Sequence, residues 1–197
     1  MAVKKIGFDF DKVFVSYPPI IPDSLIDFLY KGKIALMKKK NPEKIILKYR
    51  MPGFIEQKIR ILSHYYIFRP PIRNNINSLR LINKKGNYKV YLVSSRFGFL
   101  KDKTYKWLDR TRMKKDFDEI HFNFKNMQPH IFKEKTLKRN GITHYIDDDL
   151  DLLVYLAKKL PQNSFFWLNN KKSVDYKILP ENIKKIKNIR ELYNKYI

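Results

Sequence analysis

The chain contains no cysteine among its 197 residues. This absence excludes a disulfide framework, a thiolate nucleophile and any metal site built on thiolates. Histidine is also scarce, and the four that occur lack the close spacing of zinc motifs such as HExxH: His64, His121, His130 and His144. We therefore expect no zinc site.

Long apolar runs are absent as well. No stretch approaches the roughly 18 residues that a membrane-spanning helix needs. The N-terminal residues Met1–Lys5 lead into a short apolar segment without the extended apolar region of a signal peptide. We therefore expect a cytoplasmic protein with no membrane partner.

Acidic residues are few compared with basic ones. The chain has 42 Lys and Arg residues against 19 Asp and Glu residues, which gives a net charge of +23. Such an excess favours a polyanionic partner or substrate, such as a nucleotide, a nucleic acid or another phosphorylated molecule. The alternative is a compositional bias, although bias of the thermophilic kind normally raises Glu together with Lys.

The order of apolar segments predicts one α/β domain with a parallel sheet covered by helices on both faces. Hydrophobic residues make up 44% of the chain, enough for a sizeable core. Strand-like runs alternate with helix-like segments, which is typical of right-handed βαβ crossovers. The expected strands are Ile6–Phe10, Lys89–Ser94, Glu119–Phe122, His144–Ile146 and Ser164–Leu168, and the expected helices are Asn74–Lys85, Lys101–Met113, Phe132–Asn140, Asp149–Leu160 and a C-terminal helix after Pro180.

The connection between the first two strands is too long for an ordinary βαβ unit. It holds a surplus of about 50 residues, and loops of that length without structure are uncommon. Pro18-Pro19 and Pro22 open this segment, Arg69-Pro70-Pro71 closes it, and Lys and Arg are dense within it. We expect a basic, mainly helical insert, with helices near Phe28-Leu29 and after Pro52-Gly53.

Two carboxylates follow the first apolar run, at Asp9 and Asp11. Residues two apart in a strand point to the same face, so both acids lie opposite the neighbouring phenylalanines. Carboxylates this close repel each other and need a cation, a shared proton or solvent. The pair therefore belongs either to a ligand site at the carboxyl end of a parallel strand or to an edge strand with solvated acids.

Chemically capable residues also mark the ends of later strands. Ser94, Ser95 and Arg96 follow the second apolar strand, and Asp147, Asp148 and Asp149 follow the fourth. Lys133 opens the helix that leads into the fourth strand. Arg96 could serve either a substrate or a surface acid, and Asp149 is suited to cap the next helix.

In this order, the features resemble the motifs of phosphatases in the haloacid dehalogenase (HAD) superfamily. Asp9 and Asp11 match the DxDx[VT] motif, Ser94 matches the residue that ends the second core strand, and Asp147 and Asp148 match an acidic pair that Lys133 precedes by 14 residues. The resemblance implies a HAD-like Rossmannoid core at 1–16 and 69–197. It also implies a small helical C1-type cap at 17–68, as in nucleotidase-like members.

The resemblance also implies a reaction. Asp9 would attack phosphorus to form an aspartyl-phosphate, and Asp11 would act as the general acid and base. Mg²⁺ would bind the Asp9 carboxylate, the Asp11 carbonyl and Asp147, with Asp148 supporting the site. The family usually has glycine where this chain has Lys12. The Lys12 side chain would either reach the bound phosphate or crowd the site.

The same resemblance assigns phosphate binding to three further residues. Ser94, Ser95 and Lys133 would hold the phosphoryl oxygens. The expected substrate is a small phosphorylated molecule, with a nucleotide favoured by the basic cap. The alternative is a HAD-fold protein that binds nucleic acid or processes its phosphorylated ends and has weak or lost phosphatase activity.

Overall fold

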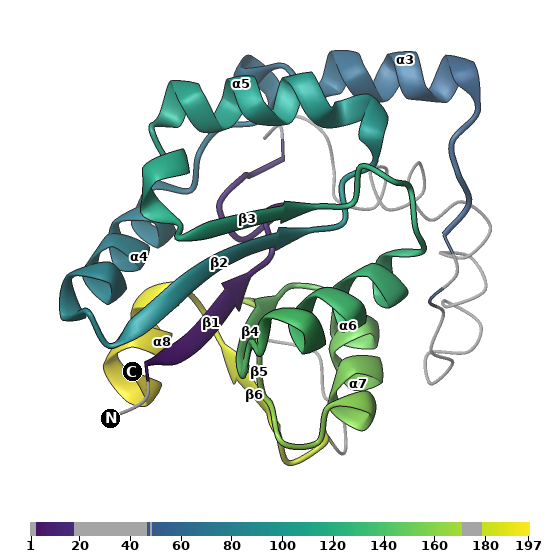
Figure 1. The fold of residues 1–197 in the computed structure, drawn as a ribbon. Coiled ribbons are helices and arrows are strands. Elements are labelled where there is room, and N and C mark those ends of the chain that lie inside the picture. The colour runs from purple at the N-terminus through teal and green to yellow at the C-terminus, as the bar shows by residue number, and fades with distance from the viewer. Residues whose placement is uncertain (1–2, 18–46, 48, 171–178) are drawn as a thin grey trace.

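The computed structural model describes residues 3–17, 47, 49–170 and 179–197. In these ranges six parallel strands form one sheet in the order β3-β2-β1-β4-β5-β6 (Figure 1). The strands are β1 (Lys4–Phe8), β2 (Tyr88–Ser94), β3 (Glu119–Phe122), β4 (His144–Asp147), β5 (Ser164–Leu168) and β6 (Ile183–Ile186). The predicted parallel α/β sheet is confirmed, together with its first five strands, although β1 begins and ends two residues earlier than the expected Ile6–Phe10.

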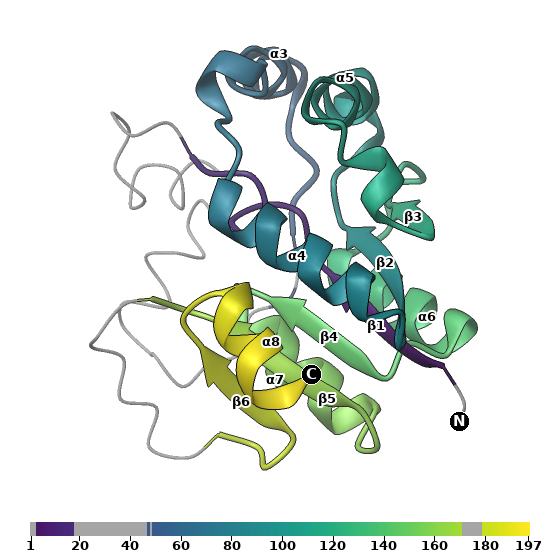
Figure 2. The ribbon, with the colours of Figure 1, turned by 90° about the vertical axis from the view of Figure 1, so that its left-hand side faces the viewer.

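Helices cover both faces of the sheet (Figures 1 and 2). One face packs against α4 (Arg73–Lys85), α5 (Lys101–Thr111) and α8 (Ile189–Tyr196), and the other against α6 (Pro129–Asn140) and α7 (Leu150–Lys159). Side chains alternate along the strands, so Leu92 joins the first layer and Tyr91 the second. No helix within the described ranges is long and apolar enough to cross a membrane.

The described part of the insert contains the helix α3 (Phe54–Ser63), as expected after Pro52-Gly53, and the short 3₁₀ helix η1 (Tyr66–Phe68). Two further 3₁₀ helices lie in the core, η2 (Gly98–Leu100) and η3 (Lys114–Asp116). The helix expected near Phe28-Leu29 lies outside the described residues. The division into a core at 1–16 and 69–197 and a cap at 17–68 stays a prediction.

Local signals set the ends of two helices as expected. Asp149 caps α7, because its Oδ1 accepts a hydrogen bond from the backbone N–H of Leu152 at 3.3 Å. Gly141 ends α6 in the left-handed region at φ 61°, where a residue without Cβ is favoured. The Asp149 cap lies at the carboxyl edge of the sheet, where α7 begins, and Gly141 lies at the opposite edge, where the chain enters β4.

The prediction for the segment after Pro180 was partly wrong. The apolar residues from Ile183 to Tyr193 were read as one helical repeat, but Ile183–Ile186 forms strand β6 and the helix begins at Ile189. In β6 the two isoleucines are buried and the two lysines between them are exposed. A short edge strand with exposed lysines shows no clear two-residue alternation, so its pattern resembles helical spacing.

The order of the strands places a ligand-binding position at the end of β1. Strand β1 lies between β2 and β4, and the chain builds outward through β2 and β3 before it returns to β4 on the other side. In open parallel sheets, ligands bind beyond the carboxyl ends of the strands where the order reverses in this way. Asp9 follows β1 directly at that position.

Candidate active site

The predicted site residues surround one cavity at the carboxyl edge of the sheet. The cavity has a volume of about 170 Å³, and all the predicted residues line it: Asp9, Asp11, Ser94, Ser95, Lys133, Asp147 and Asp148. They come from the ends of β1, β2 and β4 and from α6. The structure therefore brings the predicted residues together, while their chemical roles stay predictions.

Lys133 lies between two buried carboxylates. Its Nζ is 2.8 Å from Oδ1 of Asp9 and 2.6 Å from Oδ2 of Asp147. Burial raises the pKa of Asp9 well above its usual value; the Lys133 ammonium opposes this, and the Asp147 and Asp11 carboxylates add to it. Burial disfavours the Lys133 ammonium, but Asp147 and Asp9 hold its pKa well above the usual value. The ammonium therefore partly neutralises the two acids.

Asp148 adds a third carboxylate to this group. One carboxylate oxygen each from Asp9, Asp147 and Asp148 lies within 4.8 Å of the others. Burial raises the pKa of Asp148 to about 6, with Lys12 opposing the shift and Asp147 supporting it. A donor set made only of carboxylate oxygens fits a hard divalent cation, so these residues could hold a metal ion.

Lys12 adopts a backbone conformation that usually belongs to glycine. Its φ is 59°, and its N–H donates to the carbonyl of Val15 at 2.8 Å in a tight turn. Its Nζ lies 3.3 Å from Oδ2 of Asp148 and 5.1 Å from the centre of the Tyr17 ring. The side chain thus brings a second ammonium to the edge of the carboxylate group.

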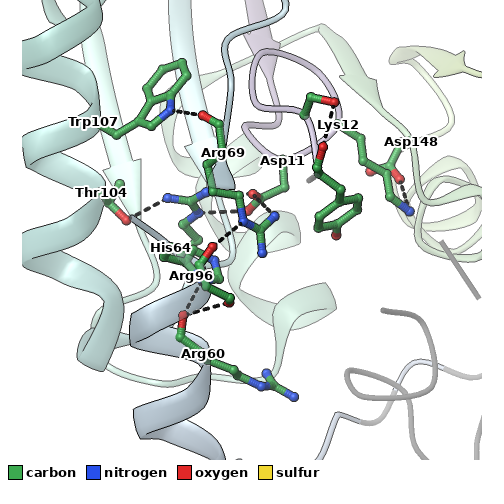
Figure 3. A network of polar contacts seen from close by, with 12 residues as sticks. Asp11, Lys12, Arg60, His64, Arg69, Arg96, Thr104, Trp107 and Asp148 are labelled. Atoms are coloured by element: carbon green, nitrogen blue, oxygen red, sulfur yellow. Dashed lines mark hydrogen bonds and ion pairs between the residues drawn. The ribbon is translucent and has the colours of Figure 1, made fainter. Parts of the chain in front are cut away.

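Asp11 has a different set of partners. Arg96 binds it with both arms of its guanidinium: Nε is 2.8 Å from Oδ2 and Nη2 is 2.6 Å from Oδ1 (Figure 3). Arg69 Nη1 lies 3.7 Å from Oδ1. Burial alone would raise the pKa of Asp11, but Arg96 and then Arg69 outweigh it and hold the pKa well below its usual range. Asp11 is therefore an ionised carboxylate in this arrangement.

The sequence left Arg96 open between a substrate and a surface acid, and gave no site role to Arg69. Both guanidiniums are buried, with residue exposures of 7% for Arg96 and 3% for Arg69. Arg69 stands at the proline-rich end of the insert, far along the chain from Asp11. A single sequence shows no pattern from which contact between two residues so far apart in the chain can be predicted.

Ser94, the last residue of β2, and Ser95, the residue after it, lie at the wall of the cavity. Ser94 is almost fully buried. The Oγ of Ser95 is also buried and has no hydrogen-bond partner among the described residues. A buried hydroxyl without a partner is unfavourable, so a ligand oxygen at this wall would satisfy it.

Tyr49 is a further cavity residue that the sequence did not identify as part of the site. Its hydroxyl donates to Oδ2 of Asp149 at 2.8 Å, and its backbone exchanges hydrogen bonds with the side-chain amide of Gln128 at 3.0 and 3.1 Å. Burial and the Asp149 carboxylate raise the pKa of Tyr49 well above its usual value. These contacts attach the insert to the N-terminal ends of α6 and α7.

No protein-family model and no curated protein matches the sequence. Solved structures do match, at low identity. A candidate β-phosphoglucomutase from Thermotoga maritima is 15% identical, with 97% of each chain covered and a TM-score of 0.61. A candidate HAD-hydrolase, YfnB from Bacillus subtilis, solved with bound magnesium, is 16% identical, with 98% of each chain covered and a TM-score of 0.58. A candidate haloacid dehalogenase-like hydrolase from Bacteroides fragilis is 15% identical, with 97% of this chain and all of that chain covered (100%) and a TM-score of 0.62. The chain therefore has the α/β fold of HAD-superfamily hydrolases.

Proposed function

We propose that the protein is a Mg²⁺-dependent phosphomonoester hydrolase that forms an aspartyl-phosphate on Asp9. The observation that carries the proposal is the arrangement of Asp9, Lys133 and Asp147 at the switch point of the sheet. Lys133 Nζ contacts both carboxylates, at 2.8 and 2.6 Å, beside a cavity that Ser94 also lines. This arrangement provides a carboxylate nucleophile and cationic support within reach of one phosphoryl group.

The carboxylates of Asp9 and Asp147 and the carbonyl of Asp11 would hold the metal ion, and Asp148, to which the sequence gave a supporting role, lies close enough to act as a further ligand. Once bound, Mg²⁺ supplies positive charge that offsets the repulsion between an anionic nucleophile and an anionic phosphate. This charge also favours the ionised form of Asp9, whose pKa burial raises. Lys133 and the serine hydroxyls would hold the phosphoryl oxygens as charge moves in the transition state.

The reaction has two steps in this scheme. An Asp9 oxygen bonds to phosphorus while the bond to the leaving oxygen breaks, and Asp11 gives that oxygen a proton. Water then attacks phosphorus, the bond to Asp9 breaks, and Asp11 takes up the proton that the water loses. Asp11 is ionised and bound to Arg96 in the structure, so before the first step it must leave those contacts and take up a proton from water.

The insert at 17–68 would act as the cap of the enzyme and select an anionic, nucleotide-like substrate. Aromatic side chains suited to stack on a base line the cavity at Tyr17, Tyr49 and Phe97. Nucleic-acid binding stays a prediction that rests on the net charge of +23.

Hydrolysis of p-nitrophenyl phosphate with Mg²⁺ or with EDTA tests the proposal. We expect turnover only with Mg²⁺, and its loss in Asp9→Asn with the fold retained by circular dichroism. Asp109→Asn, which removes an exposed carboxylate on α5, serves as the control and keeps activity. Activity in Asp9→Asn equal to that of the parent protein would contradict the mechanism.

A further inference from the structure

Arg96 and Arg69 present two guanidiniums to the same wall of the cavity. Arginine is rarely this buried, because a guanidinium removed from water needs an anionic partner. Both face the Asp11 carboxylate, which Arg96 holds at 2.6 and 2.8 Å and Arg69 approaches at 3.7 Å (Figure 3). The wall is therefore already arranged to bind a carboxylate.

Each arginine is also held by groups other than Asp11. Arg96 Nη1 donates to Oγ1 of Thr104 at 3.0 Å, and its guanidinium lies 4.4 Å from the centre of the Phe10 ring. Arg69 Nε donates to the carbonyl of Ser63 at 3.2 Å, and its guanidinium lies 4.5 Å from the centre of the Tyr17 ring. These contacts can keep both guanidiniums in place when the Asp11 carboxylate leaves.

The Arg96 fork is suited to more than one anion. Two parallel N–H groups match the oxygens of a carboxylate or of a phosphate equally well. Arg96 and Arg69 line the same cavity as Asp9 and Ser94. A ligand with its phosphate at Asp9 can therefore extend to the arginine wall without leaving the cavity.

We propose that Arg96 and Arg69 bind a second anionic group of the substrate, which replaces the Asp11 carboxylate in the Arg96 fork. The inference rests on the proposed function and specifies its substrate class: a phosphomonoester that carries a further carboxylate or phosphate. The exchange releases Asp11 toward the leaving oxygen. With a substrate that lacks the second anion, Asp11 stays bound to Arg96 for more of the time and turnover is slower, so the second anion determines specificity.

Binding of inert phosphonates tests the exchange without any turnover. The probes are alkylphosphonates, matched carboxyalkylphosphonates and matched alkane bisphosphonates, each at several chain lengths, with affinity measured by calorimetry. At the chain length that fits, we expect a dianionic probe to bind about tenfold more tightly than its alkylphosphonate match. The stronger of the two dianionic series identifies the second group as carboxylate or phosphate.

Variants separate the exchange from general charge attraction. Arg96→Gln should remove the preference for the dianionic probes. Arg80→Gln, which breaks an Arg–Asp pair with Asp116 at 3.0 Å outside the cavity, should keep it. Asp11→Asn removes the competing carboxylate, so the affinity for dianionic probes should rise by more than the affinity for alkylphosphonates.

Equal binding of matched probes at every chain length, or a preference that survives in Arg96→Gln, overturns the inference. If Arg96→Gln does not fold, Asp11→Asn provides the test. An equal change in affinity for dianionic probes and for alkylphosphonates in that variant contradicts the exchange. The proposed function is judged separately by hydrolysis. An enzyme that hydrolyses phosphomonoesters but binds matched probes equally retains its function and loses only this substrate class.

Discussion

Asp9 and Asp11 are separated by one residue, yet they meet opposite surroundings. Asp9 faces the Lys133 ammonium together with the Asp147 carboxylate, and burial raises its pKa. Asp11 faces two guanidiniums, which hold its pKa low in spite of burial. Two acids of the same type on one turn therefore have pKa values that are shifted in opposite directions, upward for Asp9 and downward for Asp11.

The cavity accordingly has two halves. The acidic half consists of Asp9, Lys133, Asp147 and Asp148, and it suits a metal ion and a reacting phosphate. The arginine half consists of Asp11, Arg69 and Arg96 together with His64, a buried residue that also lines the cavity, and it suits a bound anion. Under the proposed function, the acidic half would hold the nucleophile and the metal ion, and the arginine half would bind the second anion and hold Asp11 until that anion replaces it.

The largest effect is expected from Lys133→Met in the acidic half. The change leaves two buried carboxylates without their shared cation, so it should lower the free energy of unfolding by about 3–5 kcal/mol, as measured by urea denaturation. Lys138→Met on the same helix removes only an exposed pair with Glu134, at 2.7 Å, and should cost less than about 1 kcal/mol. Equal costs for the two variants would show that Lys133 does not support the acids.

His64 in the arginine half should make stability depend on pH. Burial and then the Arg96 and Arg69 guanidiniums keep its pKa well below the usual value, so it is neutral in the folded protein. The stability it contributes is present above its unfolded pKa of about 6.5 and is lost as the pH falls below it, by about 1.4 kcal/mol per pH unit. Urea denaturation near pH 7.5 and pH 5.5 measures this loss, and His64→Gln should lack it.

Asp11 should make the same half lose stability again at a lower pH than His64 does. Its folded pKa is depressed, so its contribution is present above the unfolded value of about 3.9 and is lost as the pH falls below it. The stability difference between the parent protein and Asp11→Asn should shrink by about 1 kcal/mol from pH 6 to pH 3. A constant difference would mean that the Arg96 contacts do not stabilise the ionised carboxylate.

The smallest effect concerns Lys12 at the edge of the acidic half. Its ammonium lies 3.3 Å from Asp148 and repels a divalent cation at the carboxylates. Lys12→Gln keeps the backbone conformation and removes the charge, so Mg²⁺ should bind about threefold more tightly by calorimetry. Lys84→Gln, an exposed change on α4, is the control. Unchanged Mg²⁺ affinity in Lys12→Gln would place the ammonium outside the influence of the metal site.

The acids of the acidic half could be predicted from the sequence because they follow apolar strands, whereas the role of Lys133 on α6 came from the family resemblance. Carboxyl ends of parallel strands meet at one edge, so Asp9, Ser94 and Asp147 had to lie close together once the strands were recognised. The N-cap role of Asp149 followed in the same way from its position before an apolar helix. These are local signals that the fold brings together.

The arginine half depends on contacts that no local pattern encodes. Arg69 and Arg96 lie far along the chain from Asp11, and the buried pair of Arg96 with Thr104 exists only after α5 packs on the core. The missed strand β6 has a similar cause, since its pairing with β5 selects the strand over a helical reading. Tertiary contacts determine both the arginine half and strand β6, and these contacts cannot be read from the sequence alone.

Detection of phosphate on Asp9 tests the central claim most directly. The enzyme would be mixed with p-nitrophenyl phosphate and Mg²⁺, quenched with acid during turnover, and digested for mass spectrometry. The account predicts a phosphorylated peptide that contains Asp9, and no such peptide from Asp9→Asn. Turnover with phosphate on another residue, or with no phosphate on the protein in any quench, would contradict the account.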